Sequence, residues 1–379
     1  MELIYLDHAA TTPVHEEVLE AMYQLEKDVF GNPSSIHSFG RKAKAYLSEA
    51  RKFLAESISA EEREIYFTSG GTEANNLAVI GTAFANEHKG NHIITTAQEH
   101  HAIIHIMQFL QKHGFHVTYL PVNESGRIEV SDVKRALTDQ TILVSVMTAN
   151  NETGVIQPIE EIGKILKEHQ AYFHTDAVQA YSMLDINVKE LNIDLLTTSS
   201  HKLNGPKGSG FLYAADDVDF QPLHFGGLQE RKKRPGTENL IGAYGFYHAA
   251  KIAKQNKEEN RKKYAKYKEI FLHTLEKEEV EFLINGDMNQ SIPTIVNISF
   301  PGTKVDVLLT NLDLAGVAAS SGSACTAGSL EPSHVLKAMY RKSERVNNSV
   351  RFSFGSANTE ENVEEAAKRV AEVVKKLTS

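Results

Sequence analysis

The segment IYFTSGGTEANN, residues 65–76, places a short apolar strand directly before a glycine turn and the first residues of a helix. Upstream of it, Ala43, Leu47, Ala50 and Leu54 recur at helical spacing, so the chain here alternates between helix and strand. This alternation is typical of a mainly parallel sheet whose strands are connected by helices.

The same rhythm continues along the chain. Six more apolar runs read as strands, at residues 93–95, 117–120, 143–146, 172–174, 195–198 and 210–213, and most are separated by enough residues for a helix. From about residue 242 to 277 the sequence is helical and highly charged, and we interpret its charge run as a solvated helix face. We expect an α/β fold with a large domain over residues 15–255. A smaller α+β domain is expected from residues 1–14 and 256–379.

Composition narrows the class of protein. The formal net charge is −9 and the pI is about 6.0, which argues against a general nucleic-acid binder, although the basic run 231–234 could meet an acidic partner. No apolar run approaches the roughly 20 residues of a membrane helix, and residues 1–8 lack the pattern of a signal peptide. We therefore expect a soluble, cytoplasmic protein with no direct nucleic-acid or membrane partner and no metal site.

Cys325 is the single cysteine of the 379 residues, which excludes an intramolecular disulfide. It stands in SSGSACTAGS, residues 320–329, a run of small and polar residues that cannot pack a core. Such surroundings favour a reactive thiol. The alternative is a small hydrophobic side chain that fills a buried gap.

Two strand ends carry candidate ligand groups, because ligands of open α/β sheets bind beyond the carboxyl ends of the strands. The Gly70-Gly71 turn and the Thr72 hydroxyl could hold a phosphate at a helix N-terminus, or could simply cap that helix. Asp176 ends another strand where solvent should be scarce, and a protonated ring nitrogen would supply the cationic partner of a buried acid. The alternative is that Asp176 caps the next helix.

Lys202 comes shortly after the strand 195–198, beyond the small hydroxyl residues that end this stretch, and a Gly-Pro turn comes after it. A lysine fixed at such a point is suited to Schiff-base chemistry with a carbonyl. Lys207, inside the turn, is a less constrained alternative, and both lysines could be ordinary surface charge.

These features, with a second glycine-threonine step at residues 234–239, match the needs of pyridoxal 5′-phosphate (PLP). The sequence resembles the class V aminotransferase-like PLP enzymes, and specifically the cysteine desulfurases of iron-sulfur assembly and nitrogen fixation. The motifs YLDHAATTP at 5–13, GNPSS at 31–35 and NSVRFS at 348–353 carry this resemblance over the whole chain. It implies a PLP-dependent transferase of fold type I, with a seven-stranded sheet in the large domain, a small domain with the Cys325 loop and Arg351, and a homodimer.

The resemblance also implies residue roles. Lys202 would form the Schiff base, Asp176 would face the pyridine nitrogen, and Gln179 would contact the ring hydroxyl. The phosphate would bind at Gly71, Thr72, Ser199 and His201, with Thr237 contributed by the other subunit.

On the substrate side, His100 would stack on the ring and relay protons, whereas the adjacent His101 is expected to be structural or to face solvent. Asn150, also expected near the cofactor, and Arg351 would clamp the substrate carboxylate. The alternative for Arg351 is a structural ion pair.

The activity implied by the resemblance is conversion of L-cysteine to L-alanine, with the sulfur left as a persulfide on Cys325. An acceptor protein, an iron-sulfur scaffold or a tRNA thiolation enzyme, would then take the sulfur. An aminotransferase or selenocysteine lyase of the same fold, or a non-catalytic sulfur-relay adaptor, are the alternatives. Asn204 and Ala327 depart from residues frequent in the family, which leaves local packing and partner preference open.

Overall fold

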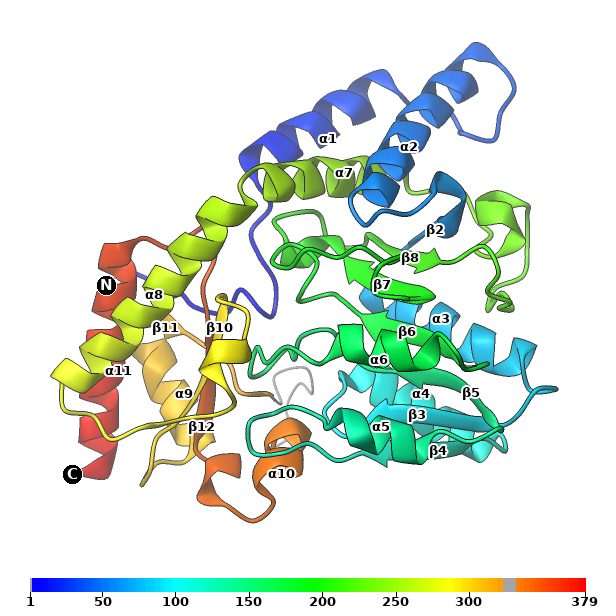
Figure 1. Cartoon of the computed structure of the whole chain (residues 1–379). Helices are drawn as coiled ribbons and strands as arrows, with labels where there is room; N and C mark the ends of the chain where they lie inside the picture. The colour runs from blue at the N-terminus through cyan, green and yellow to red at the C-terminus, as the bar shows by residue number, and fades with distance from the viewer. Residues whose placement is uncertain (1, 323–331) are drawn as a thin grey trace.

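The computed structural model describes residues 2–322 and 332–379 and has a seven-stranded sheet at its centre (Figure 1). The strand order is β2-β8-β7-β6-β5-β3-β4, in which β4, β3, β5, β6 and β7 run parallel and β8 is antiparallel to β2 and β7. The seven predicted strands are confirmed. They are β2 (Ile65–Thr68), β3 (His92–Thr96), β4 (His116–Leu120), β5 (Thr141–Ser145), β6 (Tyr172–Asp176), β7 (Leu195–Ser199) and β8 (Gly210–Ala214).

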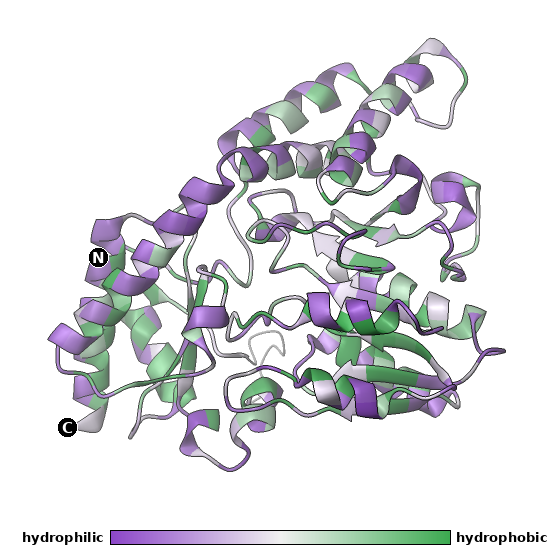
Figure 2. Cartoon of the chain, viewed as in Figure 1, coloured by the Kyte–Doolittle hydropathy of each residue, from purple (hydrophilic) through white to green (hydrophobic). Residues whose placement is uncertain are grey.

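Both faces of this sheet are buried, since successive side chains of a strand point to opposite faces. In β7, Leu195 packs with the cluster of α3 (Gly71–Ala85) and α4 (His101–Lys112), whereas Leu196 packs with the cluster that includes α5 (Val130–Ala136) and α6 (Ile159–Leu166). Much of the sheet is drawn in the green of hydrophobic residues in Figure 2. Because helices cover both faces of the sheet, a ligand can approach it only at the ends of the strands.

The charged helical stretch is two helices, α7 (Leu240–Gln255) and α8 (Lys257–Lys277), which meet at Asn256. The first packs on α1 (Glu16–Asp28) and α2 (Ser38–Glu56), and the second packs on α11 (Glu360–Thr378). Figure 1 shows α8 leading away from the large sheet. The predicted helix face is confirmed, since Tyr264 and Phe271 are buried while most residues of the charge run are exposed or half-buried. The division into domains at residues 14/15 and 255/256 stays a prediction.

A smaller antiparallel sheet, β12-β10-β9, packs beside α8, α9 (Val305–Leu314) and α11. Its strands are β9 (Leu283–Ile284), β10 (Ile295–Ser299) and β12 (Ser349–Ser353). Helix α10 (His334–Tyr340) precedes β12 in the sequence. None of the described helices is both long and apolar enough to cross a membrane.

The N-terminal segment joins distant parts of the chain. Strand β1 (Ile4–Tyr5) pairs in parallel with β11 (Val317–Ala318), and the Ser353 amide donates to the Leu6 carbonyl. Single bridges also pair Asp7 with Ser353 and Ser320 with Arg351. Residues 4–7, 317–320 and 351–353 therefore lie side by side.

Candidate active site

A cavity of about 280 Å³ lies beyond the carboxyl ends of β6 and β7, at the start of α3. Its wall combines groups from the large sheet, the N-terminal segment and β12. The residues that line it are Ala9, Ala10, Gly71, Thr72, Asn75, His100, Met147, Ala149, Asn151, Asp176, Val178, Gln179, Ser199, His201, Lys202, Gly322 and Arg351. Most of the predicted site residues are thus brought together in one place.

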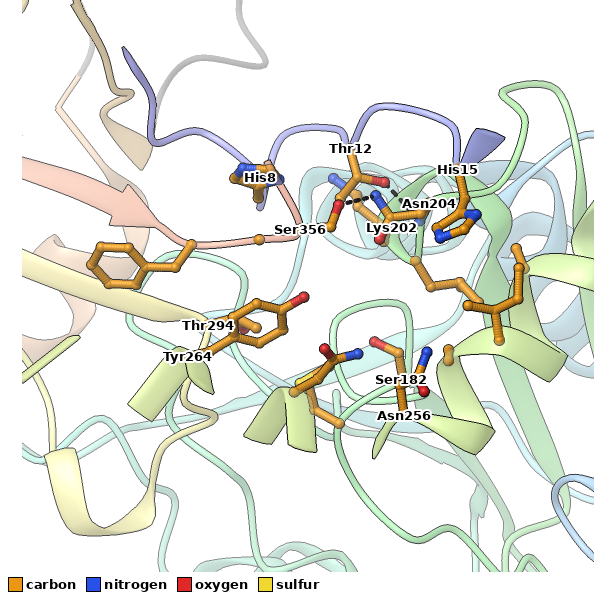
Figure 3. Close-up of a pocket in the computed structure, with 18 of the residues that line it drawn as sticks. His8, Thr12, His15, Ser182, Lys202, Asn204, Asn256, Tyr264, Thr294 and Ser356 are labelled. Carbon is orange, nitrogen blue, oxygen red and sulfur yellow. Dashed lines mark hydrogen bonds between the residues drawn. The ribbon is translucent and has the colours of Figure 1, made fainter. Parts of the chain in front are cut away.

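Lys202 lies on a short 3₁₀ turn that follows β7 directly. Its Nζ donates to the carbonyls of Ala9 at 2.5 Å and Ala10 at 2.7 Å, so the N-terminal segment holds the amine at the cavity wall. Lys202 also lines a second cavity of about 130 Å³, together with Thr12 and Asn204, which Figure 3 shows. Lys207 is exposed in the following turn and lines neither cavity.

Asp176 is the last residue of β6 and is only 6% exposed. Its Oδ1 accepts from the Val178 amide at 3.0 Å, and its Oδ2 accepts from Asn75 Nδ2 at 2.7 Å. The sequence analysis missed Asn75, although it belongs to the segment 65–76 and follows Gly71 by one helical turn, which places both on the same helix face. These bonds fix the direction in which the carboxylate faces the cavity.

The start of α3 is built for close approach of an anion. The helix begins after Gly70, whose φ is 149° and which supplies no side-chain cap, so its first amides have no capping side chain. A Cβ on Gly71 would lie 2.9 Å from Val178 Cγ2 and 3.6 Å from Ser199 Cβ. A side chain at position 71 would therefore crowd the cradle in which Thr72 and Ser199 also lie.

His201 and His100 bring two imidazoles to the cavity. His201 Nδ1 lies 3.1 Å from Thr11 Oγ1, and burial together with the positive charges of Lys202 and Lys207 lowers the pKa of His201 to about 4. Burial also lowers the pKa of His100, against the opposing attraction of Asp176. His100 caps α4 by accepting the Ala102 amide on Nδ1, so the proton of the neutral ring is on Nε2.

Arg351 forms the opposite wall of the cavity from β12 and is 4% exposed. Its Nη1 donates to the Asn151 carbonyl at 2.9 Å, and its Nη2 donates to Asp7 Oδ1 at 2.8 Å. The alternative considered from the sequence, a structural ion pair, is thus observed with Asp7, and the same guanidinium also lines the cavity. Asp7 was not singled out from the sequence.

Asn150, expected in the carboxylate clamp, is fully buried and engaged within its own turn. Its Oδ1 accepts from the amides of Glu152 and Thr153, and its Nδ2 donates to the Gln98 carbonyl. Its neighbour Asn151, and not Asn150, is among the described residues that line the cavity. The role predicted for Asn150 is untested, and the structure places its side chain behind the cavity wall.

The other predicted residues lie as follows. Gln179 lines the cavity and donates its Nε2 to the Ala9 carbonyl at 2.9 Å. Thr237 is exposed and lies outside the described residues that form the cavity. Cys325 and Ala327 lie outside the described residues. Asn204 adopts φ 63° and donates to Pro13 and Ser356, and this left-handed conformation favours asparagine over an aromatic residue.

The neighbouring His101 is half-buried, with its ring 4.5 Å from that of His334 and 5.3 Å from that of His105, measured between centroids.

Two buried acids, Glu99 and Glu152, were also missed by the sequence analysis, because nothing in their local pattern marks them as buried.

Comparison with known proteins gives consistent matches over the whole chain. The model of the family described as aminotransferase class-V matches residues 4–365. A putative cysteine desulfurase IscS 1 of Bacillus subtilis (strain 168) is 57% identical over 379 residues and is covered completely, as is this chain. A cysteine desulfurase IscS of Methanosarcina thermophila is 48% identical, with 99% of this chain and 92% of that protein covered.

Solved structures agree with these relatives. A NifS-like protein superposes with a TM-score of 0.92 at 33% identity, covering 98% of this chain and 99% of that one. The structure described as SspA in complex with cysteine has a TM-score of 0.81 at 36% identity, with 92% and 98% of the two chains covered.

Proposed function

The chain belongs to the aminotransferase class-V family and is a cysteine desulfurase, and from this premise we propose that it binds PLP in the cavity at Lys202. There it converts L-cysteine to L-alanine. The observation that carries the proposal is that Lys202, Asp176 and the uncapped start of α3 face one cavity, in an arrangement that PLP enzymes require.

The groups around the cavity fit this cofactor. The Lys202 amine suits its aldehyde, the buried Asp176 carboxylate suits its ring nitrogen, and the first turn of α3 suits its phosphate. Gly71, Thr72, Ser199 and His201 would surround the phosphate, and Gln179 would reach the ring hydroxyl. Bound PLP supplies an electron sink for bond breaking at the substrate.

Each remaining residue has a defined task. Arg351 binds the substrate carboxylate, assisted by the turn that contains Asn150 and Asn151, because a guanidinium can form two parallel hydrogen bonds with it. The Lys202 amine and the neutral His100 ring, with its proton on Nε2, move protons at the substrate.

Cys325, as a thiolate, attacks the substrate sulfur. An S–S bond forms to Cys325 while the Cβ–S bond breaks. The electron pair of that bond remains with the carbon fragment, which takes up protons and leaves as alanine. The product on the protein is a persulfide. We propose that an iron-sulfur scaffold or a tRNA thiolation enzyme accepts its terminal sulfur.

The alternative functions, an aminotransferase, a selenocysteine lyase or a sulfur-relay adaptor, are not favoured. Relatives with 48% to 57% identity over nearly the full length carry the name cysteine desulfurase, and neither an aminotransferase nor a sulfur-relay adaptor explains the sole cysteine together with the Lys202 site. No described feature favours selenocysteine over cysteine as the substrate.

We also propose a homodimer. Among the described residues, the most exposed large apolar side chains include Ile36 and Phe30, at 91% and 77% near the α1–α2 connection, and Phe225, at 90% ahead of Thr237. Apolar surface of this kind is usually covered by a partner. A second copy would also bring Thr237 to the phosphate site of its neighbour. Sedimentation as a single species of 42.1 kDa would contradict the dimer.

The test of the activity is a product assay with matched lysine variants. We expect the purified protein to be yellow and to release alanine from L-cysteine. Lys202→Ala should abolish both the colour and the alanine, whereas Lys207→Ala, which alters the exposed lysine of the same turn, should leave them intact. Cys325→Ser should keep the colour and release no sulfide. Loss of colour in Lys207→Ala alone, or normal sulfide release by Cys325→Ser, would contradict the proposal.

A further inference from the structure

Asp7 stands where the substrate side of the cavity meets the chain that leads to Cys325. Its Oδ1 accepts from Arg351 Nη2 at 2.8 Å, and its Oδ2 accepts from Ser320 Oγ at 2.7 Å. The Arg351 and Asp7 side chains are only 5% and 16% exposed, so this pair is largely shielded from solvent. One carboxylate thus links the proposed substrate-binding arginine to Ser320, five residues before the nucleophile.

The backbone reinforces this link. Ser320 forms an antiparallel bridge with Arg351, in which the Arg351 amide donates to the Ser320 carbonyl at 2.7 Å. The Asp7 backbone pairs with Ser353 on the same strand, β12. Two residues after Ser320, Gly322 lines the cavity itself. The geometry therefore joins Asp7, Ser320 and Arg351 into one unit at the cavity wall.

We propose that Asp7 is a positioning residue that competes with the substrate carboxylate for the Arg351 guanidinium and, through Ser320, couples substrate binding to the segment that leads to Cys325. The proposal rests on the proposed function, because it takes Arg351 as the group that binds the substrate carboxylate. Two carboxylates on one buried guanidinium repel each other, so the arrival of the second weakens the hold on the first.

Thermodynamic linkage makes this effect reciprocal. If the substrate carboxylate weakens the bond between Asp7 and Arg351, then removal of the Asp7 charge must strengthen substrate binding. A residue that merely oriented Arg351 would behave in the opposite way, since its loss would let the arginine drift and would weaken binding. The sign of the change in affinity therefore distinguishes competition from orientation.

The first measurement titrates the holoenzyme with L-alanine, the product, and with ethylamine, which has the same amine and no carboxylate, by the absorbance of the cofactor. Asp7→Asn is expected to tighten L-alanine binding on the order of tenfold, and to leave ethylamine binding unchanged. Asp185→Asn, which removes an exposed acid from a surface ion pair, is the matched control and should change neither. Weaker or unchanged binding of L-alanine to Asp7→Asn would overturn the proposal.

The second measurement uses the sole cysteine as a reporter, by the rate at which a thiol alkylating agent modifies Cys325 in the holoenzyme. L-alanine should raise this rate about fivefold or more in the wild-type protein, whereas ethylamine should not. Ser320→Ala removes only the hydroxyl that meets Asp7 and keeps the backbone bridge, and it should abolish the response. This variant keeps the idea testable even if Asp7→Asn does not fold. An undiminished response would overturn it.

Binding of L-alanine to the wild-type holoenzyme separates a failure of the proposed function from a failure of the role of Asp7. A wild-type holoenzyme that does not bind L-alanine contradicts the proposed function and, with it, the role of Asp7. A wild-type holoenzyme that binds L-alanine, without tighter binding in Asp7→Asn, contradicts the role of Asp7 alone.

Discussion

The wall of the cavity that carries Lys202 and Asp176 is built from neighbouring strand ends of one sheet, whereas the wall that carries Arg351 is assembled from distant segments. In the first wall, β6 and β7 are paired in the middle of the sheet; Asp176 ends β6, and Lys202 lies on the 3₁₀ turn that directly follows β7. In the second, Arg351 contacts Asp7 across 344 residues and the Asn151 carbonyl across 200.

This difference indicates how each wall should respond to substitution. Backbone pairing within the sheet holds the first wall, so a changed side chain there removes a chemical group and leaves the frame in place. Side-chain bonds hold the second wall, so a changed side chain there also alters its neighbours. We expect losses of catalysis from the first wall and shifts of affinity and coupling from the second.

The largest effect is expected at Asp176. Asp176→Asn keeps the shape and can still accept the Val178 amide, and it can bond Asn75 once the Asn75 amide turns over, but it removes the charge that would face the cofactor ring nitrogen. Alanine formation should fall by about 10²–10⁴-fold, as for other groups that support proton transfer at a reacting centre. Steady-state rates measured beside Asp132→Asn, a half-buried acid of α5 that does not line the cavity, would check this. A loss below tenfold would show that the first wall does not depend on this charge.

The fold and most of the first wall could be predicted from the sequence, because their determinants are local. Seven apolar runs gave the seven strands, and a ligand group at a strand end is recognisable from the strand itself. Asn75 escaped only because its partner, Asp176, is 101 residues away. The resemblance to a known family supplied the roles of these residues, which strand patterns alone left open.

The second wall could not be predicted to the same degree, since its contacts depend on tertiary pairing. Nothing around Asp7 indicates that β1 lies beside β11 and that residue 7 pairs with β12. Adjacent asparagines at 150 and 151 look equivalent in the sequence, yet only the turn geometry decides that the first is buried and the second lines the cavity. Such choices are settled by packing and not by local pattern.

A smaller effect is expected at Arg351. In Arg351→Lys the charge remains, but an ammonium group cannot form two parallel bonds with a carboxylate, so the KM for L-cysteine should rise by about 10–100-fold. The kcat should change much less, because the first wall is untouched. Arg135→Lys, on the exposed side of α5, is the control and should match the wild type. An unchanged KM would place the carboxylate site elsewhere and remove the contrast between the walls.

The last prediction concerns protein stability and involves Glu99, which lies between β3 and α4. It is fully buried, its Oε1 accepts from Thr96 Oγ1 and from the amide of Met147, and its carbonyl accepts from His334 Nε2 at the start of α10. Burial raises the pKa of Glu99 to about 8, helped by the nearby charge of Asp176 and opposed by the two hydrogen bonds. Glu99 is therefore largely protonated in the folded protein at neutral pH.

This protonation makes stability depend on pH in a defined direction. In the unfolded chain the pKa of Glu99 returns to 4.5, so between about pH 4.5 and 8 unfolding releases a proton. The free energy of unfolding should therefore lose up to about 1.4 kcal/mol for each unit of rising pH in this window from Glu99 alone. Glu99→Gln removes that slope, and the other titrating groups cancel when the variant is compared with the wild type.

The measurement is the difference in Tm between Glu99→Gln and the wild type, followed from pH 5 to 8. The difference in Tm should move in favour of the variant as the pH rises, because only the wild type contains a buried carboxyl group that releases a proton on unfolding. Glu160→Gln, at an exposed ion pair on α6, should show a difference that does not change in this way. A flat difference for Glu99→Gln as well would mean that Glu99 is ionised in the folded protein. In that case the segment between β3 and α4 would hold a buried charge that its surroundings balance.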